Sequence, residues 1–210
     1  MRVIAIDGSP IRGGTITAAV ETAARTLEAA GADVERVRLY ERYIRCCTGC
    51  GGCRSTGICD IEDDLTGLAR SITDADGLLI GTSGNFRRTD AALQSLLARL
   101  ARVTRGSASQ PAMSADAHVA LIAAVGEGAG LTGVLGMSPT SARRTARSLA
   151  ACGLRPLGVA SVPGPTAHPS DRDAGEDRAR ALASRLAATC ASRPRRSVLV
   201  RGRTATPALG

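Results

Sequence analysis

Five of the seven cysteines in this chain lie between residues 46 and 59, in the stretch CCTGCGGCRSTGIC. Four of them have the spacing C-x2-C-x2-C-x5-C, and the glycines among them let the backbone bend so that the thiolates face one centre. Compact runs of this kind hold [4Fe-4S] clusters, whose irons are bound by four thiolates. Two alternatives stay open: zinc, which usually takes two separated cysteine pairs, and metal-free thiol or disulfide chemistry. The four residues are Cys47, Cys50, Cys53 and Cys59.

The segment GSPIRGGTIT (residues 8–17) is a second candidate site, because it joins an apolar run to a helical pattern. Backbone N–H groups at the start of a helix point at an anion, and the helix dipole favours negative charge there. Hydroxyl groups, one arginine and two glycines add donors and room for close approach. The segment therefore predicts a phosphate site, with an ordinary capped strand-to-helix connection as the alternative. Its candidate residues are Ser9, Arg12, Gly13, Gly14, Thr15 and Thr17.

Strand and helix patterns alternate along the chain and must position these two segments. Apolar runs joined by helices indicate a parallel sheet covered on both faces, and right-handed crossovers leave few topologies. We expect an α/β fold: a flavodoxin-like, doubly wound, five-stranded parallel sheet of order 2-1-3-4-5, with the Cys-rich loop after strand 2 and ligands at the carboxyl ends of the strands. The expected strands are 2–7, 33–39, 77–81, 117–125 and 157–162, and the expected helices are 17–30, 63–73, 90–103, 139–152 and 171–189.

The length of 210 residues predicts one domain over residues 1–191, with a cluster loop at 46–60 and a basic, mostly disordered tail at 192–210. The net charge is +8, but five arginines lie in the last eighteen residues, and the body lacks the interleaved aromatics of a base-stacking surface. We therefore expect no nucleic-acid partner.

No signal peptide is recognised, and no apolar run reaches the roughly 18 residues of a membrane helix. The chain is expected to be cytoplasmic, where dense cysteines favour metal or redox chemistry.

The first loop resembles a known fingerprint. Its GSP and RGG are similar to the pattern GSPRxGGNT of the NAD(P)H-dependent FMN reductases, in which this loop binds the FMN phosphate. The resemblance covers about residues 1–190 and implies FMN as a cofactor, held by the candidate residues of segment 8–17. Thr15 and Ile16 stand where the family usually has Asn-Thr, so the side-chain donors must be rearranged, with Thr17 as a replacement.

The cysteine stretch resembles the iron-sulfur flavoproteins, a branch of the same superfamily. There, a compact C-x2-C-x2-C-x4–7-C motif binds a [4Fe-4S] cluster beside FMN, and the segment TGICDIEDD (residues 56–64) is similar to the TGxCxxxDD of that group. The resemblance implies Cys47, Cys50, Cys53 and Cys59 as ligands, with Cys46 as an extra neighbour. Cys152 and Cys190 lie in or at the end of expected helices and are interpreted as small apolar residues.

Two further loops are expected at the flavin. After strand 77–81 the family has a Pro-x-Tyr turn along the ring; here Ser83 replaces Pro and Asn85 replaces Tyr, and Phe86 either stacks on flavin or substrate or packs under the loop. Arg87 and Arg88 are candidate contacts of an anionic substrate. After strand 117–125, AVGEGAG resembles the family's Gly-rich third loop at the polar edge of the ring. The resemblance implies flavin contacts at Ser83, Gly84, Asn85, Phe86, Val125, Gly126 and Gly128.

The leading functional hypothesis is an iron-sulfur flavoprotein oxidoreductase that transfers electrons between a donor and a small-molecule or protein acceptor, with flavin-borne chemistry and no catalytic acid or base. The resemblance implies a homodimer or homotetramer, in which one subunit's cluster lies near a neighbour's flavin. The alternatives are a cluster-free NAD(P)H-dependent FMN or quinone reductase, a specialised biosynthetic redox enzyme, and a non-enzymatic module of this fold that binds a metal or a partner.

Overall fold

The computed structural model describes residues 1–82, 91–104, 117–125, 145, 147–164 and 167–192. Its centre is one sheet of five parallel strands in the order β2-β1-β3-β4-β5, which confirms the predicted flavodoxin-like topology. The strands are β1 (Arg2–Asp7), β2 (Asp33–Arg38), β3 (Gly77–Thr82), β4 (His118–Val125) and β5 (Arg155–Pro163).

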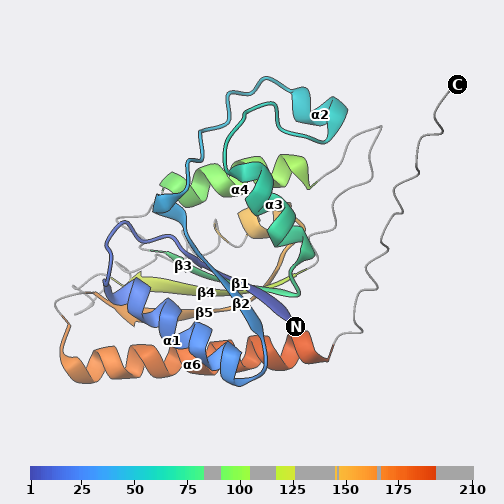
Figure 1. The fold of residues 1–210 in the computed structure, drawn as a ribbon. Coiled ribbons are helices and arrows are strands. Elements are labelled where there is room, and N and C mark those ends of the chain that lie inside the picture. The colour runs from blue at the N-terminus through green and yellow to red at the C-terminus, as the bar shows by residue number, and fades with distance from the viewer. Residues whose placement is uncertain (83–90, 105–116, 126–144, 146, 165–166, 193–210) are drawn as a thin grey trace, which may run out of the picture.

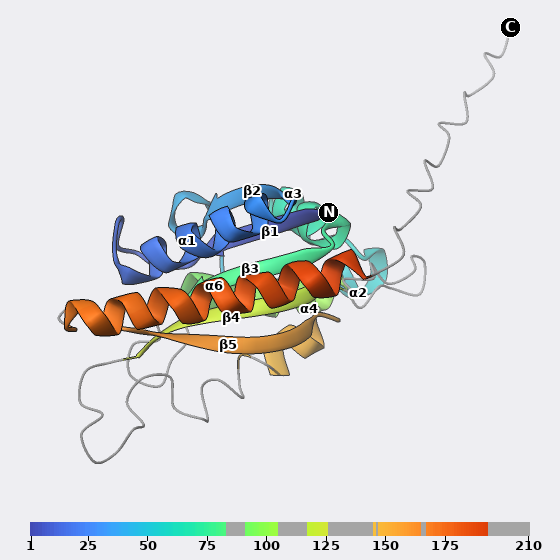
Figure 2. The same cartoon turned by 90° about the horizontal axis from the view of Figure 1, so that it is seen from below.

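Helices cover both faces of the sheet (Figures 1 and 2). One face carries α1 (Thr15–Ala29) and α6 (Pro169–Ala191), which pack against each other. The other face carries α3 (Leu65–Asp74) and α4 (Ala91–Val103), and the short helix α2 (Gly52–Thr56) lies over α4. A 3-10 turn, η1 (Leu39–Glu41), follows β2.

Two aliphatic cores follow from this layering. Successive side chains of a strand point to opposite faces, so Ile4 and Ile6 of β1 pack under α3 and α4, while Val3 and Ala5 pack under α1 and α6. Central strand β3 is buried along its whole length. The loops at the carboxyl edge of this sheet are where the fold places its ligands.

Several boundaries differ from the expectations. Helix α1 begins at Thr15, two residues earlier than predicted, and α6 extends at both ends of the predicted 171–189. The cysteine stretch, expected to be a loop throughout, contains α2. Gly51 and Gly57 flank that helix with φ of 85° and 73°, a left-handed conformation that glycine adopts without strain. The two glycines allow one helical turn to form between sharp bends.

Other predictions fall partly or wholly outside the described residues. Of the predicted helix 139–152, residues 145 and 147–151 are described and helical. The predicted tail lies outside the description from residue 193 onward. Among the described helices, none combines the length and apolar character needed to cross a membrane.

Candidate functional site

The loop between β1 and α1 is attached to the neighbouring strand at the carboxyl edge of the sheet. The N–H of Gly8 donates to the carbonyl oxygen of Gly81 over 2.9 Å. Gly81 in turn lies under α1, because an added Cβ there would come within 2.3 Å of Val20 and 2.9 Å of Ile16. The two close approaches fix where the loop leaves the sheet and where α1 begins.

A buried carboxylate that was not predicted from the sequence organises this loop. The side chain of Asp7 is 7% exposed and accepts hydrogen bonds from the N–H of Ser9 (2.9 Å) and the hydroxyl of Thr17 (2.8 Å). Arg38, at the end of β2, forms an ion pair with the same carboxylate at 2.7 Å. The only sequence signal was an acidic residue ending an otherwise apolar strand. Asp7 therefore holds the loop in shape from inside.

The predicted phosphate residues divide into two groups. Gly13, Gly14 and Thr15 line one pocket at the start of α1, opposite the end of β5 and the first turns of α6. Gly14 supplies no side-chain cap to α1, so the first N–H groups of the helix can take an anion.

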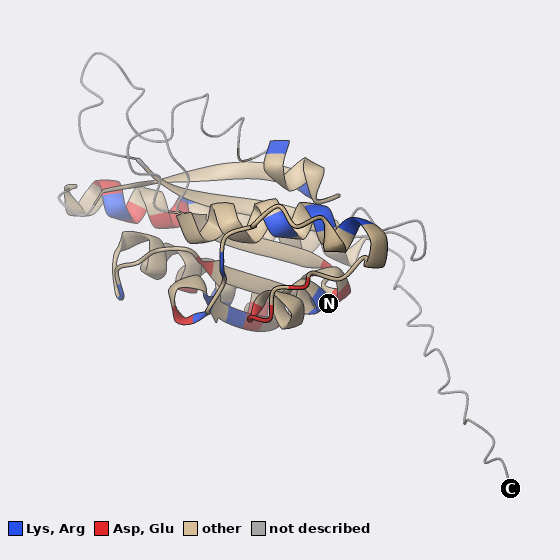
Figure 3. Ribbon diagram, turned by 90° about the horizontal axis from the view of Figure 1, so that it is seen from above, with Lys and Arg blue, Asp and Glu red and all other residues tan. Residues whose placement is uncertain are grey.

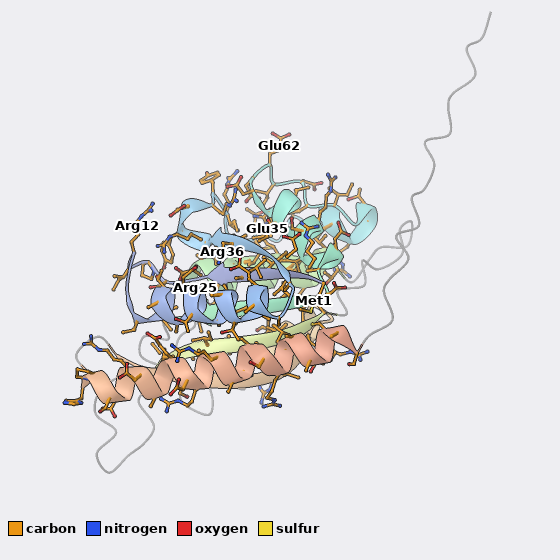
Figure 4. All side chains as sticks on the ribbon, turned by 60° about the horizontal axis from the view of Figure 1, so that its bottom comes forward. Met1, Arg12, Arg25, Glu35, Arg36 and Glu62 are labelled. Atoms are coloured by element: carbon orange, nitrogen blue, oxygen red, sulfur yellow. The ribbon has the colours of Figure 1, made fainter. Side chains whose placement is uncertain are left out.

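The other predicted phosphate residues are engaged within the protein. Ser9 is buried and its hydroxyl accepts from the N–H of Ile11, while Thr17 bonds Asp7. Arg12 extends into solvent and pairs with Glu41 at 2.9 Å (Figure 4). In this arrangement the backbone of residues 13–15 faces the pocket, whereas the side chains of Ser9, Arg12 and Thr17 shape or flank the loop.

The four predicted cluster ligands line one pocket, which lies on the face of the sheet opposite α1. Cys53 is buried, Cys59 is half-buried, and Cys47 and Cys50 are exposed. Cys46 does not line that pocket, and its sulfur lies 3.4 Å from the hydroxyl of Ser95. The structure thus groups the same four cysteines that the spacing selected. Cys152 and Cys190, as interpreted from sequence, are buried in the two cores.

Four cysteine thiols are the donors that a [4Fe-4S] cluster requires, although their sulfurs do not converge on one point. Among the described residues, no three His, Cys, Asp or Glu side chains are placed to hold a metal ion together. Burial raises the pKa of the Cys53 thiol, and the neighbouring thiols of Cys59, Cys47 and Cys50 raise it further, against a lowering by Arg102. Thiolates held close together repel one another unless a cation binds them. A metal bound by these cysteines would supply that cation, and the side chains would have to move to hold it together.

A buried ion pair anchors the cysteine segment to α4. The guanidinium of Arg99 pairs with the carboxylate of Asp63, and neither side chain is exposed. Arg99 also donates to the sulfur of Cys59 over 3.2 Å and to the carbonyl of Arg45 over 3.0 Å. Asp63 accepts from the N–H groups of Arg45 (2.9 Å) and Leu65 (3.1 Å). One pair therefore ties both ends of the segment together.

The charges of this pair are stabilised against burial. Burial would raise the pKa of Asp63, but the hydrogen bonds from Arg99 and the two N–H groups lower it overall. Burial would lower the pKa of Arg99, but Asp63 and Cys59 raise it overall. Arg99 was not predicted from the sequence. The available signal was a charged residue three positions from Leu96 and four from Val103, within the apolar face of α4.

Known proteins match parts of this chain. The family described as NADPH-dependent FMN reductase matches residues 1–139. The chain belongs to this family. An iron-sulfur flavoprotein of Methanocaldococcus jannaschii is 32% identical over 99 residues, which are 47% of this chain and 51% of the relative. A second, from Archaeoglobus fulgidus, is 29% identical over 100 residues, 48% of this chain and 46% of the relative. The chain spans about half the length of these curated relatives.

Among solved structures, an NAD(P)H:quinone oxidoreductase from Methanothermobacter marburgensis superposes with a TM-score of 0.69 at 16% identity, covering 89% of this chain and 96% of the other. At that identity the likeness concerns the fold alone. It agrees with the observed sheet order.

The remaining FMN reductase loops follow β3 and β4. Val125 is the last residue of β4. At the end of β3, the hydroxyl of Thr82 is buried and has no hydrogen-bond partner among the residues described. The other predicted flavin and substrate contacts lie outside the described residues: Ser83, Gly84, Asn85, Phe86, Arg87, Arg88, Gly126 and Gly128.

Proposed function

We propose that this member of the FMN reductase family is an FMN-dependent oxidoreductase of the iron-sulfur flavoprotein type. The observation that carries the proposal is the single pocket shared by the four cysteines of the C-x2-C-x2-C-x5-C motif. In this proposal they hold a [4Fe-4S] cluster, and electrons pass between a donor and a small-molecule or protein acceptor. The four cysteines are Cys47, Cys50, Cys53 and Cys59.

FMN would lie at the carboxyl edge of the sheet with its phosphate at the start of α1. The free first turn of α1 and the pocket at residues 13–15 support this position. Bound FMN accepts electrons in pairs or singly, and an iron-sulfur cluster exchanges them singly. The protein's own task at this edge is to bind the phosphate and to orient the ring through the loops after β3 and β4. Asp7 and Arg38 keep the first of these loops in place.

Within one subunit, the proposed FMN site and the cysteine pocket lie toward opposite edges of the sheet. A helix that joins parallel strands runs back from the carboxyl edge, so α4 ends near the amino edge of the sheet. The cysteine pocket is lined by Arg99 and Arg102, in the last turns of this 13-residue helix. The helix is about 20 Å long at 1.5 Å per residue. In Figure 1, α2 and the start of α1 likewise lie far apart.

This separation supports an assembly in which the cysteine pocket of one subunit faces the flavin edge of another. We propose a homodimer or homotetramer on that ground. A small-molecule or protein redox partner is proposed as the acceptor, and a cytoplasmic location stays a prediction. Arginine residues are interspersed with Asp and Glu over the described fold (Figure 3), an arrangement unlike the single basic stripe of a nucleic-acid surface.

The test is anaerobic purification with reconstitution by iron, sulfide and FMN. We expect a broad absorbance shoulder that bleaches with dithionite, together with about four irons and four sulfides per chain. Flavin absorbance without iron or sulfide would exclude the cluster and leave a cluster-free NAD(P)H-dependent FMN or quinone reductase. Protein that stays colourless after incubation with FMN would favour the non-enzymatic alternative.

The cluster-free reductase is the second candidate. It is favoured by one observation, that no three potential ligands among the described residues are placed to bind a metal together. Its four thiols would then act without metal. A zinc site would be recognised by bound zinc without sulfide, because zinc needs no inorganic sulfur.

A further inference from the structure

The cysteine pocket contains two positive charges that the cysteine motif does not include. Arg99 and Arg102 both line it, from positions three residues apart that are neighbours on the surface of α4. Arg99 is fully buried, and its Nη2 lies 3.2 Å from the sulfur of Cys59. Arg102 is exposed and makes no ion pair with the described residues. The two arginines therefore differ in burial but line the same pocket.

Arg99 cannot leave this position without disturbing the pocket. Its guanidinium is shared between Asp63, the sulfur of Cys59 and the carbonyls of Arg45 and Ile61. The planar guanidinium suits several fixed acceptors at once, which a lysine ammonium does not. The N–H groups of Arg45 and Leu65 bind Asp63 in return. The positive charge beside Cys59 is thus set in place before any cofactor arrives.

We propose that Arg99 and Arg102 form a cationic side of the cluster pocket that makes the cluster easier to reduce, with Arg99 as a positioning residue that holds the Cys59 sulfur. This inference rests on the proposed function. Reduction adds one electron and makes or breaks no bond in the pocket, so the change is an added negative charge. Arg99 is fully buried, and a hydrogen bond that it donates to a ligand sulfur from a site shielded from water stabilises that charge more than one at the surface; exposed Arg102 adds a weaker attraction that solvent screens. Hydrogen bonds to ligand sulfurs and nearby charge are recognised controls of cluster potential.

The experiment is an anaerobic redox titration of the reconstituted full chain with dithionite as the electron donor, after iron and sulfide have been counted. Arg102→Gln removes a charge from an exposed side chain that supports no other described residue, so the fold is retained. We expect full iron content and a several-fold smaller equilibrium constant for reduction; a tenfold change corresponds to a potential about 59 mV more negative.

Arg99→Lys keeps one positive charge and loses the forked set of donors. We expect partial loss of iron and a further fall in the equilibrium constant for reduction of the cluster that remains. Arg25→Gln is the matched control, because it removes the same charge from α1 on the opposite face of the sheet (Figure 4) and is expected to leave the potential unchanged.

The possible outcomes distinguish failure of the proposed cluster from failure of the inference about the two arginines. Wild-type protein with neither iron nor sulfide after reconstitution overturns the proposed cluster and this inference with it. Wild-type protein that carries the cluster, while Arg102→Gln and Arg99→Lys match the potential and iron content of Arg25→Gln, overturns the inference alone.

Discussion

The N–H of Gly8 donates a hydrogen bond of 2.9 Å to the carbonyl of Gly81, and the same oxygen would lie 2.8 Å from a Cβ at position 8. The obstacle is backbone of the buried central strand, so it cannot rotate away. We expect Gly8→Ala to lower the free energy of unfolding by about 1–3 kcal/mol, the usual cost of overpacking. FMN affinity should fall as well, because the phosphate loop is attached to the sheet at this bond.

Urea unfolding of the apoprotein and quenching of FMN fluorescence measure the two effects of Gly8→Ala. Gly67→Ala in α3 is the matched control, because nothing lies within 4 Å of the added Cβ and its φ is not left-handed. Alanine at an open helical position should stabilise the protein by about 0.5–1 kcal/mol. If Gly8→Ala were as stable as the wild type, the loop and β3 would be able to move apart at no cost in free energy.

A second prediction concerns the hydroxyl of Thr17, which donates to the carboxylate of Asp7 over 2.8 Å. Thr17→Val keeps the shape of the side chain and leaves that carboxylate one donor short. Because hydrogen bonds to charged groups contribute about 1.5–3 kcal/mol, we expect apoprotein stability to fall by about this amount, with weaker FMN binding as a consequence. Unfolding of the apoprotein is the deciding measurement, and Thr17→Ser should restore it.

The same variant tests the alternative role of Thr17 as a direct phosphate donor. In that case Thr17→Val would weaken FMN binding while the apoprotein unfolded as the wild type does. The two roles therefore separate on the stability of protein that contains no FMN.

A third prediction concerns pH. Arg36 bonds Glu21 at 2.9 Å and Glu28 at 2.6 Å, and these hydrogen bonds lower the pKa of both glutamates despite the opposing effect of burial. A carboxylate whose pKa is depressed by folding stabilises the protein above its unfolded pKa, and the contribution is lost as pH falls through the folded value. Arg36→Gln should therefore destabilise the protein at pH 7 and have little effect once both glutamates are protonated.

The effect should be small, because the side chains of Arg36, Glu21 and Glu28 are each about 40% exposed. Chemical unfolding of both proteins across the acid range measures it. Arg25→Gln, whose guanidinium lies 3.6 Å from Glu21, should show a weaker dependence. An equal deficit for Arg36→Gln at neutral and acid pH would mean that the ion pairs contribute nothing.

The sheet was predictable because its strands are short apolar or alternating segments separated by helical patterns. Local sequence indicated each strand and the long helices, and the handedness of crossovers left few topologies, of which the order 2-1-3-4-5 was the one expected. The cysteine spacing was equally local, since all four candidate ligands lie within thirteen residues, and the structure groups them at one pocket.

The anchors of both sites were not predictable in the same way. Arg99 and Asp63 are 36 positions apart, and Asp7 and Arg38 are 31 apart, so each pair exists only once the chain has folded. Helix α2 depends on left-handed glycines at both ends, which composition alone does not assign. Contacts between distant charged residues are specified by the whole topology, whereas the motif residues lie close together in the chain.

The last prediction separates the four motif cysteines from their neighbour. Cys47→Ser, Cys50→Ser, Cys53→Ser and Cys59→Ser should each lose most of the iron and sulfide, because a serine oxygen is a poor ligand for soft iron. Cys46→Ser should keep both, since Cys46 contacts Ser95 outside the pocket. Iron and sulfide analysis after anaerobic reconstitution measures the difference, with FMN content as the check that each variant is folded. If Cys46→Ser lost as much iron as the others, the ligand set would have to be reassigned. If every variant kept bound metal and contained no sulfide, the pocket would bind zinc instead of a cluster.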